Sequence, residues 1–350
     1  MNTQTSSIHI VRRYGPVGGM ERYVWELTHA LAKQGQNVKI ICERAYDTCD
    51  DKIDVIELGE VNPKPRWLAM IKFSKRVSKH LKATDTDGWV IHSHERCAEH
   101  HVTTFHGPSI LTRKKRALDF LSPRIATWEY LEKRELFGNN VRTILPNSLL
   151  VSGQLAKLYP TAAHKLGFPA YPGVSEQFST ITRRSQGNSI GFIGKEWQRK
   201  GLDFAVSVVK KLVDKDPSIV FIVAGPEPKE IEHLFTDWHS QNYQLMGWQR
   251  SEDLFPTIDL LIHPARVEPF GMVVAEANAA GLPVVISDHC GIAELIHQQQ
   301  GAVLPLKQQE RWGKTITTLM ATPTAEPLGL TWSHLGEKHQ QLYLQIEQDK

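Results

Sequence analysis

Two glutamates, Glu268 and Glu276, stand eight positions apart on either side of a Phe270-Gly271 step. A carboxylate ahead of a helix, backbone amides at the helix start and a second carboxylate two turns in would suit a sugar joined to a phosphate. The amides can hold phosphate because a helix start favours an anion, and carboxylates accept hydrogen bonds from hydroxyls. The alternative is an ordinary helix start with two solvated glutamates.

The elements that must position this stretch follow from its apolar pattern. Residues 260–263 predict a short buried strand, and prolines exclude a regular element from there to Met272. From Met272 onward apolar residues recur at helical spacing. We therefore expect strand, loop and helix, with Glu268 in the loop, Glu276 inside the helix and Pro269 in the first helical turn.

A cluster of three cations, Lys195, Arg199 and Lys200, occupies six residues between a predicted strand, 190–193, and a predicted helix, 202–213. The cluster suits a diphosphate, because each charge-assisted hydrogen bond contributes about 1.5–3 kcal/mol.

The N-terminal half begins with a predicted strand, 8–11, a loop ending in Gly18-Gly19, a helix and a second strand, 38–42. This order is the start of a Rossmann-like half. The loop lacks the full dinucleotide spacing, which argues against a nicotinamide site.

Histidines gather where two further strands, 89–92 and 102–105, end: His92 and His94 at the first, His106 at the second. Clustered histidines can bind zinc, but successive strand ends without nearby cysteine pairs argue against a zinc site.

The composition sets outer limits. A chain of 350 residues suits two domains, and a net charge of +3 is too small to indicate nucleic-acid binding. Four cysteines without metal or redox spacing are typical of reduced thiols in a cytoplasmic protein. The first residues show no signal-peptide core, and no apolar run approaches the ~20 residues that span a bilayer.

Together these stretches resemble the retaining glycosyltransferases of family 4. The resemblance rests on the two spaced glutamates, on the Gly18-Gly19-x-Glu21-Arg22 loop, on His106-Gly107 and on the cation loop ending in Lys200-Gly201. It implies an α/β chain with the GT-B architecture, in which two Rossmann-like domains face each other across a cleft. It also implies transfer of a hexose from a nucleotide sugar to an acceptor hydroxyl with retention of anomeric configuration.

The resemblance assigns roles to individual positions. It implies His106, Lys200 and Glu268 as catalytic residues, and Glu21 and Arg22 as acceptor-binding residues. The implied donor-binding residues are Gly18, Gly19, Lys195, Arg199, Lys200, Met246, Gly247, Glu268, Phe270, Gly271, Met272 and Glu276. The family has arginine where this chain has Lys195, so a bidentate clamp becomes a point charge, for which Arg199 can compensate.

The implied domains are an acceptor-binding domain at 1–168, a linker at 169–188, a nucleotide-sugar-binding domain at 189–330 and a helix at 331–350 that crosses back to the first domain. We expect no metal, because no carboxylate cluster lies beside the predicted phosphate-binding loops, and no cofactor beyond the donor substrate, for which a UDP-hexose is favoured over GDP-mannose.

Within the family the chain resembles the bacterial lipopolysaccharide-core enzymes. A basic run, Arg113, Lys114, Lys115 and Arg116, indicates peripheral docking of a cytoplasmic enzyme on the anionic inner membrane; solvated charges are the alternative. Two other functions remain open from the sequence: a sugar-nucleotide 2-epimerase of the same fold, and a non-catalytic nucleotide-sugar-binding protein.

Overall fold

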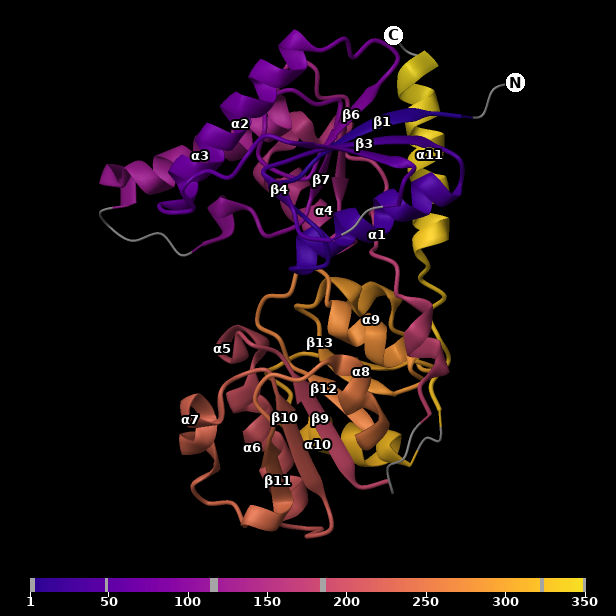
Figure 1. Cartoon of the computed structure of the whole chain (residues 1–350). Helices are drawn as coiled ribbons and strands as arrows, with labels where there is room; N and C mark the ends of the chain where they lie inside the picture. The colour runs from indigo at the N-terminus through magenta and orange to yellow at the C-terminus, as the bar shows by residue number, and fades with distance from the viewer. Residues whose placement is uncertain (1–3, 48–49, 114–118, 183–186, 322–323, 349–350) are drawn as a thin grey trace. The chain divides into compact units, whose positions relative to one another are not determined.

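The computed structural model describes residues 4–47, 50–113, 119–182, 187–321 and 324–348. It divides into two compact units, unit 1 with residues 1–173 and 332–350, and unit 2 with residues 174–331. Each unit is built on one six-stranded parallel sheet (Figure 1).

The sheet of unit 1 has the strand order β5-β3-β1-β6-β7-β8. Its strands are β1 Ser6–Ile10, β3 Asn37–Cys42, β5 Ile53–Glu57, β6 Val90–Ser93, β7 Val102–Phe105 and β8 Thr143–Pro146. A two-stranded ribbon joins β2 Arg13–Tyr14 to β4 Arg44–Ala45. The helices are α1 Gly19–Lys33, α2 Arg66–Ala83, α3 Pro123–Phe137, α4 Leu149–Leu158 and α11 Trp332–Gln348.

Helices cover both faces of this sheet (Figure 1). On one face Leu27 of α1 and Tyr343 of α11 belong to one buried cluster, and on the other Phe73 of α2 and Leu131 of α3 belong to another. Because side chains alternate along a strand, the isoleucines of β1 face α2, and the residues between them face α1 and α11.

The sheet of unit 2 repeats this order as β11-β10-β9-β12-β13-β14. Its strands are β9 Ser189–Ile193, β10 Val220–Ala224, β11 Tyr243–Leu245, β12 Leu260–His263, β13 Val284–Ser287 and β14 Gly301–Leu304. Its helices are α5 Trp197–Lys200, α6 Leu202–Val213, α7 Pro228–Ile231, α8 Ser251–Leu254, α9 Met272–Ala279 and α10 Gln309–Met320. In both sheets the order reverses between the first and fourth strands in sequence, and ligands of such folds bind beyond the carboxyl ends of the strands at this switch point.

The sequence predicted the strands and longer helices around both switch points to within a few residues. Two local expectations were wrong. Pro269 lies ahead of α9, because Gly271 is the N-cap and the helix begins at Met272. The predicted loop at 194–201 contains a short helix, α5, which ends at Lys200 and has Gly201, with a φ of 78°, as its C-cap.

Candidate functional site

The carboxylate of Glu268 is the centre of a charged cluster at the switch point of unit 2. Its Oε2 lies 3.3 Å from Arg199 Nη1, 3.7 Å from Lys200 Nζ and 3.5 Å from His263 Nε2. Lys200 and Arg199 follow β9, whereas His263 is the last residue of β12. The two strands that flank the reversal therefore bring together residues that lie more than sixty positions apart in the sequence.

Burial alone would raise the pKa of Glu268. The contact with His263 and the charges of Lys200 and Arg199 outweigh burial, and the pKa is lowered to about 2. Burial lowers the pKa of His263, so we take its imidazole as neutral. Glu268 is therefore an anion held by two cations, which makes it a weak base and a good acceptor for hydroxyl groups.

The two cations differ in how freely they can meet a ligand. Arg199 donates to Glu196 Oε2, at 2.7 and 3.0 Å, and to the carbonyl oxygen of Val267 at 2.5 Å, so it ties the two loops together. Lys200 has 18% of its side chain exposed, and its ion pair within the described part of the chain is the one with Glu268. Its stem lies against Gly194, where an added Cβ would come within 2.1 Å of Lys200 Cδ. Lys195 is exposed to solvent.

The loop that carries Glu268 is held against the segment after β13. Glu268 N donates to the carbonyl oxygen of His289, and the amides of Gly291 and Ile292 donate to the carbonyl oxygens of Glu268 and Phe270. Gly271 adopts a φ of 113°, and a Cβ there would lie 2.7 Å from Cys290 Sγ. The first amides of α9 thus directly follow a loop that is held by backbone hydrogen bonds, and this position suits them to receive an anion.

Glu276 lies buried inside α9, and Ser251 Oγ donates to its Oε2 at 3.1 Å. The neighbouring strand ends are those of β10 and β11, where Gly225 N donates to the carbonyl oxygen of Gly247 at 2.7 Å. Met246 is 41% exposed and Trp248 70% exposed. Sequence reasoning did not single out His263, nor the exposed Trp248 that follows the predicted donor-binding residue Gly247.

In unit 1 the predicted residues Gly18, Gly19, Glu21 and Arg22 lie at the start of α1, with Gly18 as its N-cap. Glu21 Oε1 accepts a hydrogen bond from Arg13 Nη2 at 2.5 Å, and Arg22 Nε lies 3.8 Å from Glu26 Oε1. These polar groups are already paired.

His106 follows β7, and the ring of Tyr23, from α1, meets it edge-on with a centroid distance of 4.7 Å. The structure therefore joins His106 to the first turns of α1 within unit 1.

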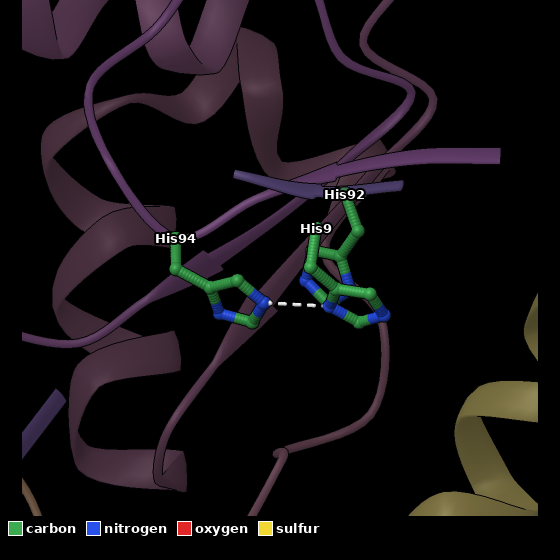
Figure 2. Close-up of side chains that lie close together, drawn as sticks. All are labelled: His9, His92 and His94. Carbon is green, nitrogen blue, oxygen red and sulfur yellow. Dashed lines mark hydrogen bonds between the residues drawn. The ribbon is translucent and has the colours of Figure 1, made fainter. Parts of the chain in front are cut away.

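Three buried histidines of unit 1, His9, His92 and His94, place ring nitrogens within 4.8 Å of one another (Figure 2). His9 and His92 are paired in register on β1 and β6, at the reversal of the sheet. Sequence reasoning found His92 and His94 but missed His9, because it treated each strand end separately.

Two Asp-x-Asp sequences were also passed over. Asp214-Lys215-Asp216 lies between α6 and β10, and therefore at the amino edge of the sheet of unit 2. The other is Asp85-Thr86-Asp87 in unit 1. It precedes β6 and therefore lies at the amino edge of the sheet, opposite the switch point. Asp85 Oδ1 accepts from Asp87 N, and Asp87 Oδ1 accepts from Gly88 N, as in ordinary turns. It does not supply ligands beside the predicted phosphate-binding loops.

Two family models match the chain, "Glycosyltransferase Family 4" over residues 17–167 and "Glycosyl transferases group 1" over residues 174–329. The chain belongs to the family 4 glycosyltransferases. It is accordingly an enzyme of the hexosyltransferase class with the GT-B fold.

Several characterised relatives of this glycosyltransferase align over nearly its whole length. It is 24% identical over 346 residues to the lipopolysaccharide glucosyltransferase WaaG of Escherichia coli K12, with 92% of this chain and 90% of that protein covered. It is 24% identical to the D-inositol 3-phosphate glycosyltransferase of Jonesia denitrificans, with 85% and 82% covered.

Solved structures show the same fold. The crystal structure of WaaG has a TM-score of 0.73 at 19% identity, and 98% of each chain is covered. Sucrose-phosphate synthase from Thermosynechococcus elongatus has a TM-score of 0.75 at 17% identity, with 99% of this glycosyltransferase and 100% of that chain covered.

Proposed function

We propose that this glycosyltransferase moves a hexose from a nucleotide sugar, a UDP-hexose before GDP-mannose, to an acceptor hydroxyl with retention of configuration and without a metal. The acceptor belongs to lipopolysaccharide or another cell-surface glycan. One observation carries the proposal: Glu268, Lys200 and Arg199 meet at the switch point of unit 2, beside the start of α9. The lipopolysaccharide glucosyltransferase among its relatives supports the acceptor class.

In this mechanism Lys200 and the first amides of α9 stabilise the negative charge that grows on the departing diphosphate. Glu268 accepts hydrogen bonds from sugar hydroxyls, and Glu276 accepts from the ribose. Because the pKa of Glu268 is lowered to about 2, it is a poor general base. The acceptor proton would instead pass to the leaving phosphate on the same face of the sugar, which retains the configuration.

The metal-free part of the proposal rests on these cations. Lys200 and Arg199 supply at the strand end the positive charge that a divalent ion would otherwise provide. Both Asp-x-Asp pairs, Asp85 with Asp87 and Asp214 with Asp216, come just before a strand, so they lie at the amino edges of the two sheets and away from the carboxyl ends of the strands.

The deciding experiment incubates the purified enzyme with UDP-glucose, other UDP-hexoses and GDP-mannose, with and without truncated lipopolysaccharide, followed by mass analysis. Transfer, or slow donor hydrolysis without acceptor, supports the proposal, and NMR of the product reads the anomeric configuration. An isomerised sugar nucleotide would show a 2-epimerase instead. Binding without turnover of any donor would reduce the protein to a binding module.

We also propose that unit 1 docks on an anionic membrane surface through Arg113, Lys114, Lys115 and Arg116. Of these, Lys114, Lys115 and Arg116 lie outside the described residues. Arg113 pairs with Asp119 at 2.5 Å, so its charge is partly compensated. Exposed cations on α2 add to the surface charge: Lys72, Lys75, Arg76 and Lys79. No helix in the described part of the chain is long and apolar enough to cross a bilayer.

Each cation near an anionic surface contributes about 1 kcal/mol, so vesicle binding should weaken at high salt. We expect a variant with residues 113–116 changed to Ser to sediment less with anionic vesicles than the wild type. A control changes four exposed lysines of unit 2 to Ser: Lys211, Lys215, Lys229 and Lys307. Equal binding of the wild type and the 113–116 variant would refute this docking site.

A further inference from the structure

Four side chains of unit 1 form a continuous hydrogen-bonded chain that ends at His106. Ser7 Oγ lies 3.2 Å from His9 Nε2, His9 Nδ1 lies 3.0 Å from His94 Nε2, and His94 Nδ1 lies 3.1 Å from His106 Nε2. Ser7, His9 and His94 are buried. Each ring nitrogen in the interior of the chain meets one partner, so the four groups are linked in a single line.

His92 lies beside this chain without joining it (Figure 2). Its ring stacks on His94 with a centroid distance of 4.3 Å. Its Nδ1 faces the hydroxyl of Tyr343 at 2.6 Å, and its Nε2 faces the hydroxyl of Thr104 at 2.8 Å. Both nitrogens of His92 are therefore occupied by hydroxyl groups.

A metal is the competing explanation for three clustered imidazoles. Tetrahedral zinc with bonds of about 2.0–2.1 Å places its ligand nitrogens about 3.3 Å apart. Here His9 Nδ1 and His94 Nε2 lie at the hydrogen-bond distance of 3.0 Å, and the ring nitrogens of His92 already face two hydroxyl groups. The hydrogen-bonded chain accounts for the polar atoms of His9 and His94 without an ion.

The three imidazoles in this hydrogen-bonded line, those of His9, His94 and His106, are neutral. Burial lowers the pKa of His9 to about 3 and that of His106 to about 3, and it lowers the pKa of His94 well below its ordinary value. A neutral imidazole carries one N–H and one bare nitrogen. A line of such rings has only two proton arrangements that avoid placing two N–H groups, or two bare nitrogens, against each other.

Ser7 selects between these two arrangements. If its hydroxyl donates to His9 Nε2, then His9 Nδ1–H donates to His94 Nε2, and His94 Nδ1–H donates to His106 Nε2. If its hydroxyl accepts instead, its own proton is left without a partner, because Ser7 Oγ has no other hydrogen-bond partner among the described residues. A buried donor left unpaired is costly, so the first arrangement is favoured.

We propose that Ser7, His9 and His94 are positioning residues that hold His106 as the Nδ1–H tautomer, so that its ring nitrogen outside the chain is a hydrogen-bond donor to the sugar substrate. The contact with substrate rests on the function proposed above, whereas the tautomer of His106 does not. The identity of a serine on β1 thereby fixes the hydrogen-bonding role of a histidine that directly follows β7.

Nitrogen-15 NMR of histidine-labelled protein tests the tautomer directly, with signals assigned through single His→Gln variants. We expect His9, His94 and His106 in the Nδ1–H form, whereas neutral histidine in water favours Nε2–H. Ser7→Ala removes the group that selects between the two arrangements, because either one then leaves His9 Nε2 unpaired, so His106 should become a mixture of the two tautomers. His100→Asn is the control, because His100 is equally buried but donates to the carbonyl oxygen of Glu135, outside the chain. The proposal would be overturned if His106 were in the Nε2–H form in the wild type, or if Ser7→Ala left the tautomer population of His106 unchanged.

Kinetics then test the positioning role. Ser7→Ala and His9→Phe should lower kcat severalfold, because only part of the population then keeps His106 in the Nδ1–H form, with a much smaller change in the KM for the donor. His9→Asn should restore activity, because its amide N–H can still donate to His94. If no donor is turned over, the proposed function fails while the tautomer result stands. An unchanged kcat in Ser7→Ala with a shifted tautomer would refute the positioning role, and one equivalent of tightly bound zinc lost in His9→Asn would replace the chain by a metal centre.

Discussion

The switch points of the two units place different chemistry at the same position of the same topology. In unit 2 the strands β9 and β12 bring together a carboxylate and two cations around Glu268. In unit 1 the strands β1 and β6 bring together neutral imidazoles around His94. The parallel sheet determines where polar side chains converge. The residue types determine whether they form a cluster of ionised groups or a line of hydrogen bonds between neutral groups.

This difference predicts how each region fails. A charged cluster acts through Coulomb interactions, and removing one member exposes the others to an unbalanced charge. A neutral chain acts through the direction of its hydrogen bonds, so it is sensitive to any change that protonates a member. The following predictions test that contrast.

The largest expected effect is that of Lys200→Ala in unit 2. We expect turnover to fall by about a hundredfold, because losing a cation that stabilises transition-state charge costs roughly 3 kcal/mol. The measurement is kcat with the preferred donor. Lys210→Ala is the control, since Lys210 pairs with Asp214 on α6. Wild-type turnover in Lys200→Ala would remove this loop from the diphosphate site.

Mild acid should destabilise unit 1 before unit 2. Burial lowers the pKa of His9 to about 3 and that of His339 to about 4, below the ordinary 6.5. At pH values between these folded-state pKa values and 6.5, the unfolded chain therefore binds more protons than the folded protein. Their stabilisation is complete above pH 6.5 and is lost as the pH falls toward these values. The loss is on the order of 2 kcal/mol per independent imidazole at pH 5.

The carboxylate of Glu268 contributes in a different window. Its pKa is lowered to about 2, so its stabilisation is complete above the ordinary value of 4.5 and is lost only below it. Among the described residues of unit 2, His263 is the histidine whose pKa is lowered. Pulse proteolysis in urea at pH 7.5 and pH 5, with fragments assigned by mass, should show unit 1 cleaved first at pH 5. Equal sensitivity of both units would contradict the contrast.

A smaller effect is expected from Glu276→Gln. A ribose hydroxyl donates more strongly to a carboxylate than to an amide, so nucleotide affinity should fall by about tenfold while the fold is kept. Calorimetry with the nucleoside diphosphate measures this. Glu310→Gln, at an exposed position of α10, is the matched control. Unchanged affinity in Glu276→Gln would mean that this carboxylate does not bind the nucleotide.

The smallest expected effect is that of a chelator. Prolonged EDTA treatment should leave both kcat and thermal unfolding unchanged, because cations of unit 2 serve the phosphates and hydroxyl groups satisfy His92 in unit 1. Loss of activity restored by Mg²⁺ would contradict the metal-free mechanism. A lowered unfolding temperature restored by Zn²⁺ would instead indicate a histidine metal centre.

The sequence was sufficient for much of this arrangement. Apolar runs bounded by Gly and Pro predicted the parallel strands, and helical spacing after Met272 predicted α9 with Glu276 inside it. These features are local, so a pattern of a few residues carries them. The family resemblance rests on the same kind of local spacing, and the two family models bear it out.

What the sequence could not supply depends on contacts between distant segments. His9 looks like one polar residue in an apolar strand until the register of β1 and β6 sets it beside His92. His263 looks like the end of a buried strand until the loop returns Glu268 to within 3.5 Å of it. Periodicity reports which face a residue occupies, but it does not report which residue lies opposite.

The position of α11 at the C-terminal end of unit 1 affects the order in which the two units can fold during synthesis. Unit 2 is one continuous segment, whereas unit 1 needs α11, which packs along α1 and brings the Tyr343 hydroxyl to His92. At about 5–20 residues per second, the ribosome needs roughly 10–35 s after residue 173 to deliver that helix. During this interval unit 2 can finish folding while the sheet of unit 1 still lacks part of its cover. The order of completion is thus the reverse of the order of synthesis, and a nascent chain released early would hold a finished second half beside an unfinished first one.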